Sequence, residues 1–179
     1  MKPQTRLTLA RIAALVIVIG ITVVIFINRD KADALAAYGY PGIFLLAFLA
    51  YATVLLPAPG LAFVFTMGAV FQPTGVALAA GAGATLGEIS GYLAGFSGQA
   101  VIENTQLYLK MKLWMQKNGP LAVLLLAAVP NPVFDLAGVT AGALKMPLAK
   151  FLLWCFFGEV IKMYLFARVG SSSLNYLFK

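Results

Sequence analysis

A single charged side chain stands in the long apolar middle of this chain. Within residues 34–102 the only charged residue is Glu88, and residues 32–109 contain no basic residue. An ionised group in hydrocarbon is costly, so charged residues of membrane segments face a bundle interior or a water-filled cavity. Asp135 and Glu159 stand in similarly apolar surroundings. We therefore take these three acids as the first candidates for functional residues.

The composition predicts an all-α integral membrane protein. Of the 179 residues, 61% are hydrophobic and 11% are charged, whereas soluble domains carry about 25% charged residues. The length corresponds to a single domain. The net charge is +7, and the basic residues lie at the ends of apolar segments, where they would meet anionic lipid headgroups. We therefore expect a lipid partner and no nucleic acid.

The residue types exclude several kinds of chemistry. The chain has no histidine, which removes His-ligated metals and histidine-based nucleophilic catalysis. Its one cysteine, Cys155, cannot form an internal disulfide, and its apolar neighbours predict an inert thiol. The glycines recur at helical spacing and not as a phosphate-binding turn. We predict no enzyme, no metal and no cofactor.

The N-terminal part, residues 1–39, is predicted to hold a transmembrane anchor followed by an interfacial segment. An apolar run at 12–27 follows three basic residues and is long enough to cross a bilayer. A cleaved signal peptide is the alternative, because Ala32-Asp33-Ala34 resembles a cleavage site. The charged residues at 29–31 favour an uncleaved anchor.

The central part, residues 40–170, divides into short and long segments. Residues 76–101 and 148–169 are long enough for full spans, and residues 102–119 have the mixed pattern of an amphipathic helix in the membrane interface. A polar and aromatic tail follows at 171–179. Four apolar pieces are each too short for a full span, and they lie at 43–56, 61–71, 121–129 and 133–144.

The two halves of this central part resemble each other. The breaks LPAPG and VPNPV are followed by matching small-residue triplets, single prolines and Gly-Glu pairs, at offsets of 71–74 residues. Short, Gly/Pro-interrupted segments in corresponding halves indicate a transport site. We predict an inverted repeat (about 43–101 and 121–170) of two re-entrant helical hairpins, each followed by a transmembrane helix. Fully spanning hairpins are the alternative. A cytoplasmic N-terminus places eight basic residues inside and four outside, as the positive-inside rule requires.

Paired prolines mark the predicted hairpin tips. Proline lacks a backbone donor and disfavours helix at the preceding residue, so the helices should unwind there. Carbonyls freed in this way cannot face lipid and must be buried or line a water-filled cavity. Two tips meeting near the midplane would form such a cavity, whereas ordinary loops between short spans are the alternative. The four tip prolines are Pro57, Pro59, Pro130 and Pro132.

Small residues and charges on the predicted helices each allow two interpretations. A stripe of glycines permits close packing of helices within the chain or between copies in a homo-oligomer. Glu88 lies within this stripe and is either a functional residue or bonded to a neighbouring helix. Asp135 either caps a helix or faces the cavity. Glu159 and Lys162 are three residues apart, so they either form a structural pair or share the transport path. The stripe consists of Gly83, Gly87, Gly91 and Gly95.

Two stretches of this sequence resemble a known superfamily. PNPVFDLAGVTAGALKMPLAKF, followed by GEVIK, is similar to a segment of eukaryotic members linked to autophagy. GATLGEISGY resembles the small-residue segment of the same members and the LGD-x-x-GY segment of bacterial DedA proteins. The chain thus resembles the VTT-domain, or DedA, superfamily over about 40–170. Its short length suits a prokaryotic member in the plasma membrane.

This resemblance implies two re-entrant hairpins and lipid transport, either scrambling of phospholipid or flipping of undecaprenyl phosphate or phospholipid. Typical DedA proteins carry a PGD at the first tip, where this chain has APGL, and arginines around the second tip, where it has Ala127, Ala128 and Asp135. A mechanism in which those arginines hold a phosphate is therefore not expected here. The residues carried over are Glu88, Gly87, Tyr92, Pro130, Asn131, Pro132, Phe134, Asp135 and Gly138.

We therefore expect a scramblase or flippase with a polar groove between the hairpin tips, holding water and protons. A proton- or ion-coupled transporter of small solutes is one alternative, and a membrane assembly factor without transport activity is another. The residues expected to contact the lipid headgroup are Glu88, Asp135, Glu159, Lys162, Asn131 and Tyr92.

Overall fold

The computed structural model describes residues 32–52, 60–97, 106–130 and 134–177, and every regular element in these ranges is an α-helix. The predicted all-α class is thus confirmed for this part of the chain. The predicted N-terminal anchor lies outside the described residues. So do three of the four predicted tip prolines, Pro57, Pro59 and Pro132, and the predicted headgroup contact Asn131.

The first described helix, α2 (Ala32–Ala52), joins two segments that the sequence separates. We predicted an interfacial segment up to residue 39 and a hairpin arm from residue 43, but α2 runs through Pro41 without a break. Pro41 and Gly42 are exposed, so the proline ring lies on the outer face of the helix. No neighbouring helix therefore has to adapt to it. The predicted boundary between 39 and 40 falls inside this helix.

The predicted segment 76–101 begins earlier and is kinked. After α3 (Gly60–Val70), the helix α4 (Pro73–Gly87) starts with a proline, which suits a first helical position. α5 (Ile89–Phe96) follows after Glu88, which separates the two helices although its φ of −64° and ψ of −12° lie in the helical region. Helical hydrogen bonds continue across this point, from Glu88 N to Ala84 O at 3.0 Å and from Tyr92 N to Glu88 O at 3.1 Å.

The second half begins with α6 (Gln106–Ala128), which merges the predicted interfacial helix with the next hairpin arm. A kink at Asn118 (φ −146°, ψ 60°) separates the two parts, next to residue 119, where the amphipathic helix was predicted to end. α7 (Phe134–Ala143) and α8 (Leu148–Leu177) follow. α8 extends through most of the predicted tail. In this part of the helix the Ser173 hydroxyl donates to Val169 O at 2.8 Å.

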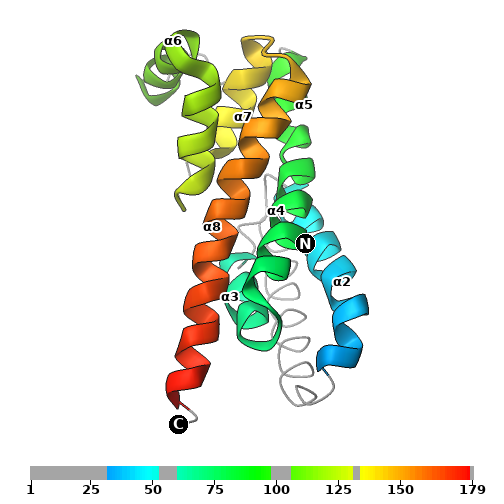
Figure 1. The fold of residues 1–179 in the computed structure, drawn as a ribbon. Helices are drawn as coiled ribbons and strands as arrows, with labels where there is room; N and C mark the ends of the chain where they lie inside the picture. Colours follow the sequence, from blue (N-terminus) through cyan, green and yellow to red (C-terminus); the bar gives the residue numbers. More distant parts are fainter. Residues whose placement is uncertain (1–31, 53–59, 98–105, 131–133, 178–179) are drawn as a thin grey trace, which may run out of the picture.

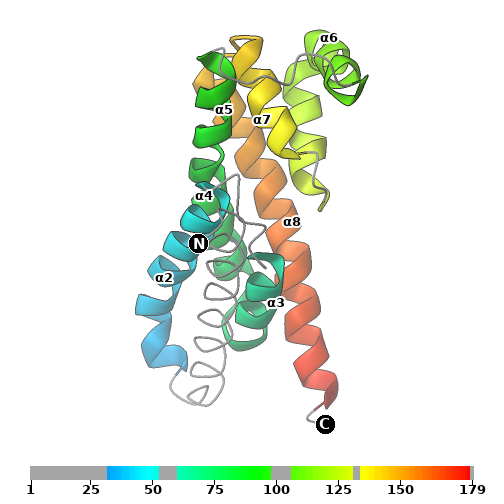
Figure 2. The ribbon, with the colours of Figure 1, turned by 180° about the vertical axis from the view of Figure 1, so that it is seen from behind.

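α8 runs the length of the molecule and organises the other helices (Figures 1 and 2). The second part of α6 packs on α8 toward its first half, and α3 and α4 pack on α8 toward its second half, whereas α7 packs on α5 and α2 packs on α4. None of the helices in the described ranges is both long enough and apolar enough to cross a membrane. The predicted full spans at 76–101 and 148–169 are therefore not supported. The first is kinked at Glu88, and α8 carries four charged residues along its length: Lys150, Glu159, Lys162 and Arg168.

Two separate apolar cores lie along α8. One contains Ala84, on α4, and Met163, on α8, and the other contains Tyr92, on α5, and Cys155, on α8. The stretch of α8 between the cores holds Glu159 and Lys162, and the stretch between α4 and α5 holds Glu88. The charged residues therefore occupy a layer between two apolar cores.

The helices of the two halves make corresponding contacts. α3 packs on the second half of α8, where Gly68 lies against the backbone of Ala167. α7 packs on α5, where Gly142 lies against the backbone of Tyr92 and Phe96. Gly68 and Gly142 are matched positions of the two halves, 74 residues apart. Thus α3 of the first half packs on α8 of the second half, and α7 of the second half packs on α5 of the first half.

The α7–α8 turn gives the first prediction, because Lys145 has a positive φ of 53°. A non-glycine residue in this region costs about 1–2 kcal/mol. We expect Lys145→Gly to raise stability by about 0.5–1 kcal/mol, since the greater backbone entropy of glycine offsets part of the relief. The measurement is thermal unfolding of the purified protein in detergent. Lys112→Gly, which removes the same side chain inside α6, should destabilise by about 1 kcal/mol. A lower midpoint for Lys145→Gly would contradict the assignment of strain.

The α5–α7 contact gives the second prediction. A Cβ atom at Gly95 would fall on the carbonyl group of Val139, whereas a Cβ at Gly42 would meet nothing within 4 Å. We expect Gly95→Ala to destabilise the protein by about 1–3 kcal/mol, because the two helices must separate. Gly42→Ala should be neutral or stabilising by up to about 1 kcal/mol. Equal unfolding midpoints for both variants would show that α5 and α7 are not in close contact.

Candidate functional site

A buried ion pair forms the centre of the charged layer, which we define as Glu88, Glu159 and Lys162. Lys162 Nζ lies 2.7 Å from Glu159 Oε1. The lysine side chain is 5% exposed and the glutamate side chain is fully buried. The three-residue spacing places both groups on the same face of α8, as the sequence indicated. Each ion loses its hydration, so the pair persists only with further favourable contacts around it.

Two aromatic rings supply such contacts to the lysine. Lys162 Nζ lies 5.3 Å from the ring centroid of Tyr51 and 5.6 Å from that of Phe134. A cation at this distance is attracted by the negative face of the ring. Tyr51 lies in the last turn of α2, and Phe134 is the first residue of α7. Both rings therefore adjoin the predicted hairpin tips, and Lys162 lies between the arms of the two hairpins.

The Gly-Glu pairs of the two halves lie at equivalent places. Gly87 lies against the backbone of Tyr51 and Ala52, at the end of α2. Gly158 lies against Ala127 and Ala128, at the end of α6. Each pair thus contacts the helix end that leads into the tip of its own hairpin. The adjoining acids, residues 88 and 159, are brought to the same level by these contacts.

Glu88 belongs to the same layer although it lies on a different helix. It is 3% exposed, and its carboxylate faces Gly138 of α7. Glu88, Glu159 and Lys162 all lie near enough to the buried thiol of Cys155 to act on it electrostatically. The layer therefore holds two acids and one base, which gives a formal charge of −1 when all three are ionised.

Small polar groups complete the layer. The Thr85 hydroxyl donates to Gly81 O at 2.7 Å, one turn before Glu88, and lies within hydrogen-bonding reach of the Cys155 thiol. Sequence reasoning missed Thr85 and Tyr51 as members of this region. For Tyr51 the available signal is an aromatic residue a few positions before a proline pair. Cys155 is buried, as predicted, but lies beside charged groups.

Not every predicted site residue faces the layer. Asp135 is the second residue of α7 and therefore lies in its first turn, next to Phe134; its side chain lies outside the description. Pro130 is exposed just beyond α6. Tyr92 is buried, its ring stacks on Phe151 at 5.3 Å, and its hydroxyl donates to Met146 O at 2.5 Å. Tyr92 thus ties α5 to the α7–α8 turn.

The glycine stripe divides between different neighbours. Gly83 lies against Phe44 and Phe48 of α2, as Gly87 lies against the end of the same helix. Gly95 lies against Val139 of α7, and Gly91 is buried. The change of partner occurs at the Glu88 kink. These glycines and Gly138 therefore contact helices of the same chain in this structure.

Comparison with known proteins found one matching family and several similar curated proteins. The VTT domain family matches residues 56–172. Vacuole membrane protein 1 of Homo sapiens and of Mus musculus are each 43% identical to this chain over 47 residues. That stretch is 26% of this chain and 10% of either relative, so the chain covers only a small part of the curated relatives it matches. No solved structure matches. Since the matched range is more than half of the 179 residues, the chain belongs to the VTT domain family.

Proposed function

We propose that this protein is a membrane lipid transporter that moves phospholipid or polyprenyl-phosphate headgroups between leaflets, as a scramblase or flippase. The observation that carries the proposal is the charged layer between two apolar cores, beside the arms of both hairpins. Membership of the VTT domain family and the similarity to a protein named for a membrane support a membrane location. We further propose a prokaryotic plasma membrane with a cytoplasmic N-terminus.

The proposed path runs between the hairpin tips. Lys162 contacts rings from both hairpins, and Glu88 lies at a helix kink that brings its carboxylate to the same layer. A lipid headgroup is zwitterionic or anionic, so a layer with both signs of charge can replace part of its hydration. The acyl chains would remain in the surrounding lipid. The corresponding contacts of the two halves support an inverted repeat with re-entrant hairpins.

The transport role of Glu88 gives the third prediction. Glu88→Gln keeps the size of the side chain and removes its charge, so we expect folding to persist. We expect lipid crossing to slow about tenfold, the factor given by a rise of about 1.4 kcal/mol in the barrier. The measurement is dithionite quenching of fluorescent lipid in liposomes that contain the purified protein, with and without a pH gradient. Asp135→Asn should also slow crossing.

A matched control comes from Asp33, in the first turn of α2. It lies 18 residues before Tyr51, or about 27 Å along the helix. Asp33→Asn should leave the crossing rate unchanged. Normal crossing by Glu88→Gln would remove this acid from the mechanism. Proton flux that depends on a small solute, without lipid movement, would replace the proposal with a solute transporter.

The ion pair gives the fourth prediction, which separates stability from transport. Lys162→Met leaves Glu159 as an uncompensated buried charge and should destabilise the protein by about 3–5 kcal/mol. The double variant Glu159→Gln/Lys162→Met removes both charges and should recover most of that loss. Thermal unfolding in detergent measures this recovery.

Transport by the double variant then distinguishes the two interpretations of the pair. If the pair serves the headgroup path, crossing stays slow although stability returns. Wild-type crossing by the stable double variant would mean that the pair has a structural role only, and the transport path would then lie elsewhere.

A further inference from the structure

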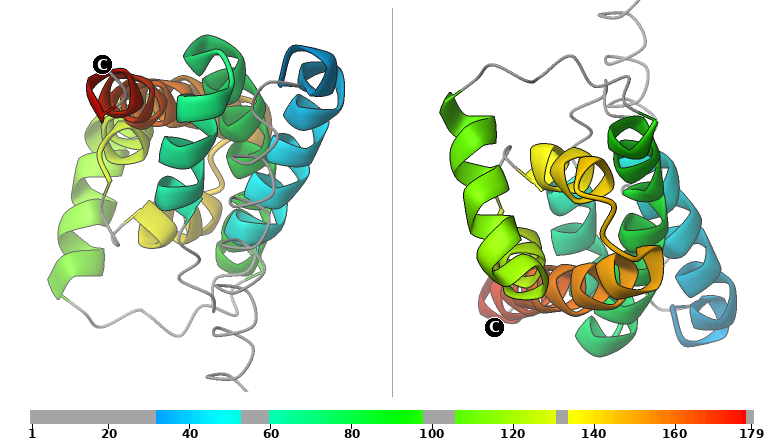
Figure 3. Two further views of the ribbon diagram at one scale, coloured as in Figure 1. Left: turned by 90° about the horizontal axis from the view of Figure 1, so that it is seen from below. Right: turned by 90° about the horizontal axis from the view of Figure 1, so that it is seen from above.

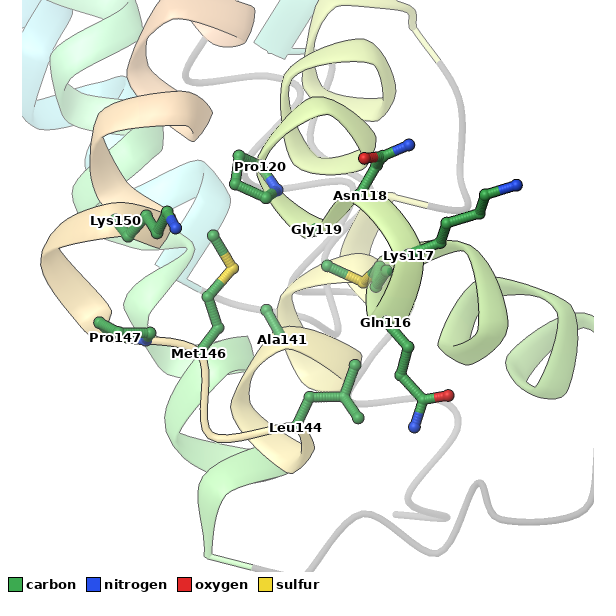
Figure 4. A pocket seen from close by; sticks show the side chains of 11 residues that line it. Gln116, Lys117, Asn118, Gly119, Pro120, Ala141, Leu144, Met146, Pro147 and Lys150 are labelled. Carbon is green, nitrogen blue, oxygen red and sulfur yellow. The ribbon is translucent and has the colours of Figure 1, made fainter.

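A polar pocket lies at the end of the helices, away from the charged layer. It has a volume of about 570 Å³ and opens where the kink of α6 meets the α7–α8 turn (Figure 4). This volume is within the range of about 300–1,000 Å³ that small-molecule sites occupy. The residues that carry the argument are Lys117, Asn118, Gly119, Pro120, Pro147 and Lys150.

The charges at this pocket are all positive. Lys150 points its amine toward the pocket, and Lys117 lies on the opposite rim with its amine directed outward (Figure 4). Lys145 lies in the turn between two lining residues, Leu144 and Met146. The described lining contains no acidic residue. The positive charges of these lysines therefore favour an anionic ligand.

Backbone groups around the pocket favour the same sign of charge. α8 begins at Leu148, and its first hydrogen bonds run from Lys150 N and Phe151 N to Pro147 O, at 2.9 and 3.0 Å. The first amides of a helix have no acceptor inside it, and because Lys150 N and Phe151 N already donate to Pro147 O, the amides in question here are those of Leu148 and Ala149. The second part of α6 also begins at the pocket, after the Asn118 kink. Two helix N-termini, each with a partial positive charge, therefore lie at its rim.

The negative end of α7 is already neutralised by hydrogen bonds. Lys145 N donates to Gly142 O at 2.9 Å, and Met146 N donates to Ala141 O at 3.0 Å. These two bonds and the positive φ of Lys145 form a Schellman motif. Met146 O accepts the hydroxyl of Tyr92. The carbonyl groups of this helix end thus have donors of their own and do not repel an anion in the pocket.

The surroundings of the pocket distinguish a lipid from a soluble anion. On the first part of α6, Leu113 is 68% exposed and Trp114 is 38% exposed. Leu121 and Leu125 are exposed on the second part, directly after Pro120. Exposed apolar groups next to lysines are typical of a surface that lies in the membrane interface. A ligand in this pocket would therefore have hydrocarbon available at its edge.

We propose that this pocket binds the phosphate of an anionic phospholipid headgroup, with Lys150 and the N-terminus of α8 as its main donors. The shared chemistry is a phosphate group, and inorganic phosphate is the alternative source. The site is independent of the charged layer, because it uses none of the residues of that layer.

The fifth prediction tests this site in the full-length protein in detergent. Calorimetric titration with short-chain phosphatidylglycerol measures binding, and short-chain phosphatidylcholine and inorganic phosphate are titrated separately. We expect Lys150→Glu to weaken phosphatidylglycerol binding by more than roughly tenfold, because a charge-assisted contact is replaced by repulsion. Lys112→Glu, on the first part of α6 and outside the pocket lining, makes the same charge reversal and should weaken binding less than about twofold, because a charge that does not contact the ligand is screened by salt and solvent.

The outcomes separate the sources of the phosphate. Binding of phosphatidylglycerol without comparable binding of inorganic phosphate supports the lipid headgroup. Equal binding of inorganic phosphate overturns the lipid assignment and leaves a site for soluble anions. Equal losses in Lys150→Glu and Lys112→Glu overturn the pocket, because binding would then follow the overall charge. Thermal unfolding of each variant verifies that it remains folded.

Discussion

The buried pair of Glu159 and Lys162 constrains the arrangement of the other helices. Removing two charges from water costs several kcal/mol per ion, and the 2.7 Å contact between them offsets this cost only with additional partners. The rings of Tyr51 and Phe134 are two such partners for the lysine, and they belong to different halves of the chain. Consequently the end of α2 and the start of α7 must both reach the middle of α8. The right panel of Figure 3 shows α7 lying between α5 and α6, next to α8.

Close backbone contacts keep the helices at this level. Gly87 and Gly158 have no side chain to separate their helices from the ends of α2 and α6. The next residue of each pair is an acid of the charged layer, so close packing and charge placement depend on the same dipeptide. The apolar cores on either side exclude water from the pair's flanks.

Much of this arrangement was predictable from sequence because its signals are local. The proline pairs follow the ends of α2 and α6, and single prolines preceded or opened later helices at Pro73 and Pro147. The continuity of α2 through Pro41 was not predictable, because it depends on which face of the helix is exposed. The kink at Glu88 lies within an apolar run that has no proline.

The partners of Lys162 were also beyond local reasoning, for a different reason. Tyr51 precedes it by 111 residues, and no periodic pattern in a single sequence links positions so far apart. The acids themselves were identified because ionised groups are rare in apolar sequence. Sequence therefore identified which residues are unusual, whereas the structure supplied the rings and helix ends that surround them.

The length of α8 relates the surface pocket to the charged layer. Lys150 and Lys162 are twelve residues apart on this helix, which corresponds to about 18 Å. The hydrocarbon core of a bilayer is about 30 Å thick, so its midplane lies about 15 Å below the headgroups. If Lys150 binds a phosphate at the membrane surface, and α8 stands close to the bilayer normal, Lys162 lies near the midplane. The pocket and the charged layer would then be two independent sites at different depths along a single helix, one at the headgroups and one near the midplane.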